Sequence, residues 1–215
     1  TPDEKLTIAR QLARLGVDAF EAGFPISSEG EAAGGRLVAK DGLSTEVYAL
    51  ARANSQDIDT ALNCDVGPVH IFIATSDLHL QRKRKLSREQ ALDKVVQAVS
   101  YAKDHGLVVE FSAEDATRSD PEYLKRVLSS VCEAGADQIN VPDTVGTASP
   151  DLMRRIIGSV NQVIDRPISV HCHDDFGLAV ANSLAGIEAG ASQAHVTING
   201  IGERAGNASL EELVM

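Results

Sequence analysis

The chain has 215 residues, of which 43% are hydrophobic and 24% are charged, which is ordinary for a globular protein and too apolar for a disordered one. Its net charge of −11 disfavours nucleic acid as a main partner, because phosphate contacts need a basic surface. The apolar runs are too short to span a membrane, and three widely spaced cysteines do not form a disulfide framework. We therefore expect a cytoplasmic protein that contacts neither nucleic acid nor membrane.

Short apolar runs alternate along the chain with longer segments of helical spacing. The predicted helices cover residues 3–15, 29–40, 54–63, 87–104, 121–134, 150–164, 176–189 and 208–215. The predicted strands cover residues 17–23, 45–50, 67–75, 107–113, 136–142, 167–173 and 193–198. Four helices are expected to end at a glycine that accepts a left-handed conformation, namely Gly16, Gly106, Gly135 and Gly190.

This alternation of strand and helix predicts a parallel sheet with right-handed crossovers, which leaves an open doubly wound sheet and a closed (βα)8 barrel as alternatives. The barrel is favoured because the alternation is strict and the chain begins with a helix, so one further strand in front would complete eight units. The predicted fold class is therefore α/β, a (βα)8 TIM barrel that lacks its first strand. Residues 1–215 are expected to be one partial catalytic domain.

In such a barrel the active site lies at the carboxyl ends of the strands. His171 and His173 stand two residues apart at the end of the strand predicted over 167–173, so both imidazoles are expected on one face. Two imidazoles on one face can bind a divalent metal, with Asp174 or Asp175 orienting them. The alternative is a pair of satisfied polar residues at a strand end.

A metal bound by two imidazoles needs further ligands, and a mixed nitrogen and oxygen set suits Mn, Mg, Co or Zn. Asn207 is one candidate for the oxygen ligand, because it ends a glycine-rich loop just before the last predicted helix. The alternative is that Asn207 caps that helix.

Two other strand ends carry candidate catalytic groups. Glu114 lies with Glu110 and Asp115 at the end of one strand, where a carboxylate can act as an acid or base, or remain a solvated charge on the rim. Thr144 follows the next strand and offers a hydroxyl for a substrate carboxylate, or the start of a turn.

The remaining candidates have weaker patterns. His70 lies inside an apolar strand, either as a core residue or facing the barrel mouth. The only basic run, residues 82–85, is either a solvated face or an anchor for an anionic ligand such as a CoA phosphate. Four residues without partners at useful spacing are interpreted as structural: His105, His195, Cys64 and Cys132.

The segment His171-Cys-His-Asp-Asp-Phe-Gly-Leu-Ala-Val-Ala-Asn182 resembles a signature of the 2-isopropylmalate synthase family. The same resemblance extends over EAGFP at 21–25, HIFIATSDLH at 70–79, VEFSAEDATRS at 109–119, NVPDTVGTASP at 140–150 and NGIGERAGNASLEE at 199–212. It implies a metal-dependent acyltransferase of leucine biosynthesis on a (βα)8 barrel, a homodimer in its full-length form. The implied reaction is a Claisen condensation of acetyl-CoA with 3-methyl-2-oxobutanoate, followed by thioester hydrolysis.

By this resemblance His171, His173 and Asn207 correspond to the metal site and Glu114 to a catalytic acidic residue. Thr144 corresponds to a group that holds the carboxylate of the 2-oxo acid, and His70 to a residue of the substrate pocket. The family's first strand brings an arginine and an acidic metal ligand, which have no counterpart in this chain. We therefore expect these 215 residues alone to have little or no synthase activity.

Four alternatives to isopropylmalate synthesis remain open. Two are other condensations, citramalate synthesis from pyruvate and homocitrate synthesis. The third is carbon–carbon cleavage by a lyase or aldolase, and the fourth is a truncated barrel without turnover.

Overall fold

The computed structural model describes all 215 residues. Its strands are β1 (Ala19–Glu21), β2 (Glu46–Arg52), β3 (Pro68–Ala74), β4 (Val108–Glu114), β5 (Gln138–Asp143), β6 (Ile168–Cys172) and β7 (Gln193–His195). Its helices are α1 (Pro2–Leu15), α2 (Glu29–Ala39), α3 (Ser55–Leu62), α4 (Asp77–His79), α5 (Arg88–Asp104), α6 (Pro121–Glu133), α7 (Pro150–Asn161), α8 (Ala179–Glu188) and α9 (Leu210–Val214). Between them lie the 3₁₀ turns η1 (Pro25–Ser27), η3 (Ala116–Arg118) and η4 (Ile198–Gly200) and one π-helical turn, η2 (Leu80–Arg84).

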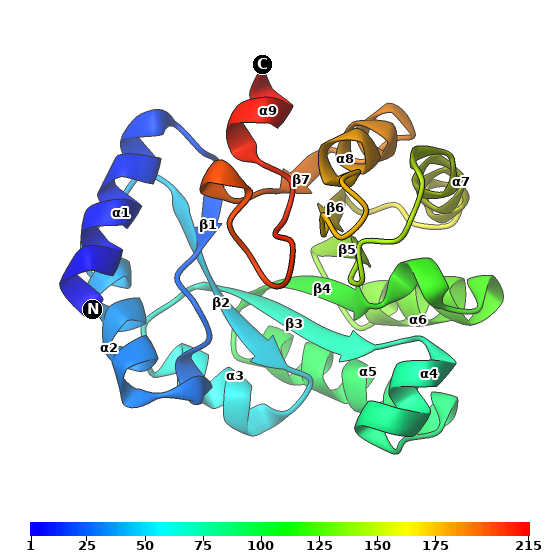
Figure 1. Ribbon diagram of the computed structural model, residues 1–215. Coiled ribbons are helices and arrows are strands. Elements are labelled where there is room, and N and C mark those ends of the chain that lie inside the picture. Colours follow the sequence, from blue (N-terminus) through cyan, green and yellow to red (C-terminus); the bar gives the residue numbers. More distant parts are fainter. The chain divides into compact units, whose positions relative to one another are not determined.

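The sheet has the strand order β1-β2-β3-β4-β5-β6-β7, so each strand follows its predecessor in the chain (Figure 1). The pairs β1–β2, β2–β3, β5–β6 and β6–β7 are parallel. Sequential parallel strands joined by helices are the topology of a (βα)8 barrel, and seven of its eight strands are present here. The predicted fold class is confirmed, and each predicted helix and strand is found within a few residues of its expected bounds.

The chain divides into two compact units. Unit 1 comprises residues 1–72, 94–110 and 134–136, and unit 2 comprises residues 73–93, 111–133 and 137–215. Strands β3 and β4 each begin in unit 1 and end in unit 2.

Local signals in the sequence explain where the helices begin and end. Thr1 and Glu4 form a capping box at the start of α1, and Ser87 and Gln90 exchange the same pair of hydrogen bonds before α5. The four glycines predicted to end helices all have positive φ values, between +78° and +115°.

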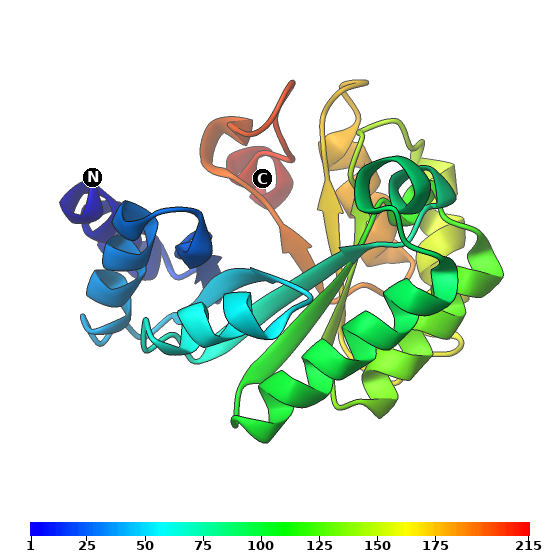
Figure 2. The same cartoon turned by 90° about the horizontal axis from the view of Figure 1, so that it is seen from below.

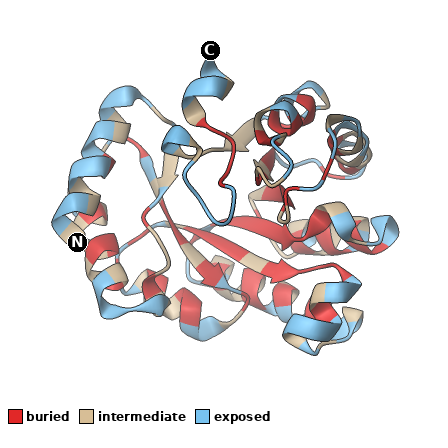
Figure 3. Ribbon diagram, viewed as in Figure 1, coloured by how far each residue is buried: buried red, intermediate tan, exposed pale blue.

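The core is aliphatic, as a chain without tryptophan requires. Apart from Phe111, the largest fully buried side chains are Ile, Leu, Val and Met. Figure 3 shows β3 and β4 buried along most of their length, whereas Ala9 is the one buried residue of α1. None of the helices combines the length and apolar composition that a membrane span requires.

The last three strands position the residues of the candidate site. In unit 2, Pro142 of β5 pairs with His171 of β6, and His171 pairs with His195 of β7. Helices α7 and α8 lie side by side in both ribbon views (Figures 1 and 2). The buried thiol of Cys172 contacts Ser183 of α8, so it faces away from the two histidines as predicted.

Candidate metal centre

Two histidines at the end of β6 turn their rings toward each other. His171 is the penultimate residue of β6 and His173 follows the strand, so both side chains lie on one face, as predicted. Their Nε2 atoms are 3.3 Å apart. Two nitrogens bound to one tetrahedral Zn²⁺ at roughly 2.0–2.1 Å would be about 3.3–3.4 Å apart. The spacing of this pair therefore fits a shared divalent ion.

Asn207 brings a third donor to the histidine pair from the loop after β7. Its backbone pairs with His173 in an isolated antiparallel bridge, and the loop is held further by the bond from Asp174 N to Gly206 O, 3.0 Å long. The Asn207 amide Nδ2 lies 3.3 Å from His171 Nε2. A half-turn of the amide group presents Oδ1 at the same place, so Asn207 fits the role of an oxygen ligand.

Asn207 does not cap the helix that follows it. Ser209 is the N-cap of α9, and its hydroxyl accepts the Glu212 N–H at 3.3 Å. The N-cap interpretation is wrong, and the Asn207 side chain is directed instead to the histidine pair.

Two glycines allow this loop to close on itself. A Cβ atom at Gly202 would overlap Oδ1 of Asn207, and one at Gly206 would overlap the carbonyl oxygen of Gly200. Gly206 also has a φ of +100°, which L-residues rarely adopt. The glycine-rich sequence therefore lets the backbone approach closely enough to hold Asn207 beside His171.

The electrostatics around His173 favour metal binding. His173 is buried, and burial lowers its pKa, with the positive charge of Arg204 acting in the same direction. Neutral imidazole is the form that binds a metal. The structure holds no group of three or more His, Cys, Asp or Glu side chains placed to bind one ion. The donor set is two imidazoles and an amide, which leaves positions for oxygen ligands from solvent or substrate.

His195, which is predicted to be structural, is a neighbour of this site. It lies directly opposite His171 in the parallel pairing of β6 and β7. The two Nδ1 atoms are 3.4 Å apart, and the rings meet edge to face at 86°. No local motif marks His195 as part of the site. Its place follows from the register in which β6 and β7 pair.

The two aspartates that follow the histidines hold the surrounding loops. Asp174 accepts the Ala179 N–H at the start of α8, at 2.9 Å. Asp175 binds both Nε and Nη2 of Arg204, at 2.8 Å each, and Nη2 also donates to the Thr144 carbonyl. Arg204 therefore ties together the loops after β5, β6 and β7.

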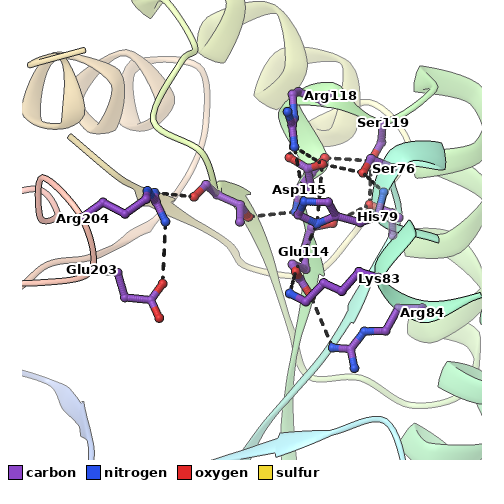
Figure 4. A network of polar contacts seen from close by, with 12 residues as sticks. Ser76, His79, Lys83, Arg84, Glu114, Asp115, Arg118, Ser119, Glu203 and Arg204 are labelled. Carbon is purple, nitrogen blue, oxygen red and sulfur yellow. Dashed lines mark hydrogen bonds and ion pairs between the residues drawn. The ribbon is translucent and has the colours of Figure 1, made fainter. Parts of the chain in front are cut away.

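Glu114, the predicted acidic residue, is the centre of a cationic cluster (Figure 4). Its Oε1 lies 2.5 Å from Lys83 Nζ and 3.2 Å from His79 Nδ1, and its Oε2 lies 3.5 Å from Arg84 Nη2. The side chain is only 11% exposed, so the alternative of a solvated rim charge is wrong. This arrangement fixes the carboxylate in one position, as a group that transfers a proton requires.

The cations of this cluster come from the basic run at residues 82–85, which forms most of the π-helical turn η2. Lys83 and Arg84 turn toward Glu114, while Lys85 ends the turn in the left-handed region with φ +54°. Three of the four residues are exposed, as a solvated face requires, and Arg84 is half-buried against Glu114.

Thr144 is attached to the segment that carries Glu114. Its Oγ1 accepts the N–H of Asp115 at 2.8 Å. Asp115 is itself buried and held by Arg118 through both carboxylate oxygens. Because the Thr144 oxygen is the acceptor in this bond, its own proton remains available to be donated to a carboxylate.

His70 belongs to unit 1, where it is buried on β3 and its Nδ1 pairs with the carboxylate of Glu21. Burial by itself lowers the pKa of His70, but the charges of Glu21 and Glu110 and the hydrogen bond to Glu21 outweigh it. The resulting pKa is about 9. His70 is therefore a cation at neutral pH, and the Glu21 carboxylate balances its charge.

The HMGL-like family model matches residues 1–215. A probable 2-isopropylmalate synthase of Methanopyrus kandleri is 58% identical over all of this chain and 43% of its own length. A homocitrate synthase of the same organism, AksA, is 54% identical over all of this chain and 54% of its own length. The chain thus spans about half the length of the curated relatives it matches.

The fold also has a close counterpart among solved structures. The HMG-CoA lyase of Bacillus subtilis superimposes with a TM-score of 0.86 at 20% identity, covering all of this chain and 78% of that one. At this identity the likeness concerns the fold alone.

Proposed function

This chain belongs to the HMGL-like family, and from this premise we propose that it carries the catalytic site of an acyltransferase. The proposed reaction joins acetyl-CoA to 3-methyl-2-oxobutanoate and gives 2-isopropylmalate. The observation that carries the proposal is the convergence of His171 and His173, with Nε2 atoms 3.3 Å apart, beside Asn207. The relatives named 2-isopropylmalate synthase at 54–58% identity support the choice of reaction.

The residues present fit a divalent metal ion, which His171, His173 and Asn207 would hold. When bound, such an ion polarises the carbonyl of the 2-oxo acid as a Lewis acid. The chain's own groups then position the substrates. The Thr144 hydroxyl donates to the carboxylate of the 2-oxo acid, and His70 is proposed as a residue that contacts the substrate.

Glu114 is proposed to transfer the proton. A new bond forms between the acetyl methyl carbon, which loses a proton, and the keto carbon, whose oxygen gains one. Water then cleaves the thioester and releases CoA. Lys83 and Arg84 hold the Glu114 carboxylate at a fixed place for this proton transfer.

Homocitrate synthesis is the second candidate, because a relative of that name is 54% identical over the whole chain. The two reactions share the chemistry above and differ in the side chain of the 2-oxo acid. Citramalate synthesis differs in the same way.

The test supplies the natural protein that contains these residues with acetyl-CoA and one 2-oxo acid at a time: 3-methyl-2-oxobutanoate, 2-oxoglutarate or pyruvate. Thiol release and mass spectrometry of the product identify the acceptor, and a hydroxyacyl-CoA tests cleavage. We expect 3-methyl-2-oxobutanoate to be preferred and H171A to lose both activity and zinc binding. A preference for another acid would reassign the substrate, and zinc binding unchanged in H171A would refute the metal centre.

A further inference from the structure

We propose that His195 is a positioning residue that accepts a hydrogen bond from Nδ1 of His171 and so presents Nε2 of His171 to the metal ion. This inference rests on the proposed function, since it concerns the same metal centre. It assigns a role to a histidine that no sequence pattern in the chain marks out.

The first observation is the strand pairing. His171 and His195 occupy paired positions on the adjacent parallel strands β6 and β7, so their side chains leave the sheet on the same face. Although they are 24 residues apart in the chain, the backbone fixes them as neighbours. Their proximity does not depend on a flexible loop.

The second observation is which nitrogens meet. Nε2 of His171 faces His173 and Asn207, each at 3.3 Å. Nδ1 of His171 faces Nδ1 of His195 at 3.4 Å. One nitrogen of the His171 ring therefore faces the other proposed metal ligands, and the opposite nitrogen faces His195.

The positions of the protons on the two rings then fix the direction of the hydrogen bond. A neutral His171 that offers Nε2 to a metal carries its proton on Nδ1. That N–H needs an acceptor, and His195 provides one when its own proton is on Nε2. Metal-binding histidines usually donate their second nitrogen in this way, and loss of the acceptor costs roughly 10–100-fold in metal affinity.

The test compares two substitutions at position 195. The amide of an asparagine places a polar atom close to where Nδ1 of histidine lies, so H195N retains an acceptor. Leucine retains bulk but accepts nothing, so H195L removes the hydrogen-bond acceptor. We expect H195N to bind Zn²⁺ nearly as the unsubstituted protein does, and H195L to bind it 10–100-fold more weakly by calorimetry. H105L is the matched control, because His105 lies in unit 1 at the end of α5 and contacts the Tyr101 carbonyl.

A second readout follows the bond itself. In zinc-loaded protein with ¹⁵N-labelled histidine, the His171 Hδ1 proton should be protected from exchange in the unsubstituted protein and H195N, and unprotected in H195L. A role in packing alone predicts the reverse order of affinities, with H195L retaining zinc and H195N losing it. That order, or equal affinity in the two variants, overturns the inference.

The outcomes separate this inference from its premise. If the unsubstituted protein binds no Zn²⁺, or H171A binds it equally well, the metal centre itself is refuted. If H171A loses zinc while H195L keeps full affinity, the metal centre stands and only the role of His195 falls.

Discussion

His70 in unit 1 and His173 in unit 2 are both buried histidines, and their surroundings give them opposite charge states. Burial lowers the pKa of each, because it disfavours the charged form. Around His70 the carboxylates of Glu21 and Glu110 reverse that effect and raise its pKa to about 9. Around His173 the largest charge contribution comes from Arg204 and acts in the same direction as burial.

Burial favours the neutral form of both histidines, and it is the largest single cause of the lowered pKa of His173. Around His70 the neighbouring carboxylates outweigh burial. A buried histidine in this protein is therefore a cation where carboxylates surround it, whereas one beside an arginine stays neutral and suits a metal. The sequence supplies each neighbour from a distant segment, 49 residues away for Glu21 and His70.

The largest expected effect comes from Gly206→Ala, which should displace the loop that holds Asn207 beside His171 in unit 2. A left-handed alanine costs about 1–2 kcal/mol, and the overlap with the Gly200 carbonyl forces a backbone shift that costs about 1–3 kcal/mol more. Urea denaturation should therefore show a loss of about 2–5 kcal/mol, and zinc affinity should fall with it. The control is Gly16→Ala, which has φ +88° and no atom within 4 Å of the added Cβ. Equal losses in the two variants would show that the loop has room for a side chain.

Glu21→Gln should make the protonation of His70 more like that of His173, because it removes a carboxylate that raises the pKa of His70. Without that carboxylate, burial is opposed only by the charge of Glu110, so the pKa of His70 should fall well below 9. The measurement is a pH titration of the His70 ring proton by NMR. Glu46→Gln, which removes an exposed carboxylate of the same unit, should leave the titration unchanged. A midpoint that stays near 9 in Glu21→Gln would mean that Glu21 is not the partner that sets the charge.

The same pair predicts how stability depends on pH. The pKa of His70 is raised from 6.5 to about 9 in the folded state, and at 1.36 kcal/mol per pKa unit this corresponds to about 3 kcal/mol. A raised pKa contributes stability that is complete below pH 6.5 and is lost as the pH rises through about 9. The difference in unfolding free energy between unsubstituted protein and Glu21→Gln should therefore be large at pH 6 and nearly absent at pH 10. A difference that is constant over this range would exclude the titration of His70 as its cause.

The fold and half of the candidate site could be predicted from local pattern. Alternation of apolar residues gave the strands, and the two-residue spacing of His171 and His173 placed both rings on one face. The role of Asn207 was left open because a single asparagine before a helix is equally suited to capping. Only the three-dimensional structure shows that Ser209 takes the cap.

The remainder of the site depends on pairing between distant segments. His195 meets His171 through the register of β6 and β7, which spacing within either strand does not encode. Lys83 and Arg84 reach Glu114 because the basic run folds into a π-helical turn, too short to have a periodic signature. The charged side chains that shift the pKa values of His70 and His173 likewise come from distant segments, so they cannot be identified before the chain is folded.

The smallest expected effect comes from Arg204→Gln, which tests whether an arginine near the metal centre organises its loops. The Arg204–Asp175 pair is partly exposed, at 43% and 24% for the two side chains, so its loss should lower the unfolding free energy by about 1 kcal/mol or less. Zinc affinity should nevertheless fall several-fold, because Arg204 also holds the Thr144 carbonyl and lies on the loop that carries Asn207. Arg154→Gln removes a comparable surface pair with Glu188, at 49% and 64% exposure, and should change stability equally little while leaving zinc affinity intact. If both variants bind zinc alike, Arg204 contributes no more than an ordinary surface ion pair, and the loop is held by its backbone bonds alone.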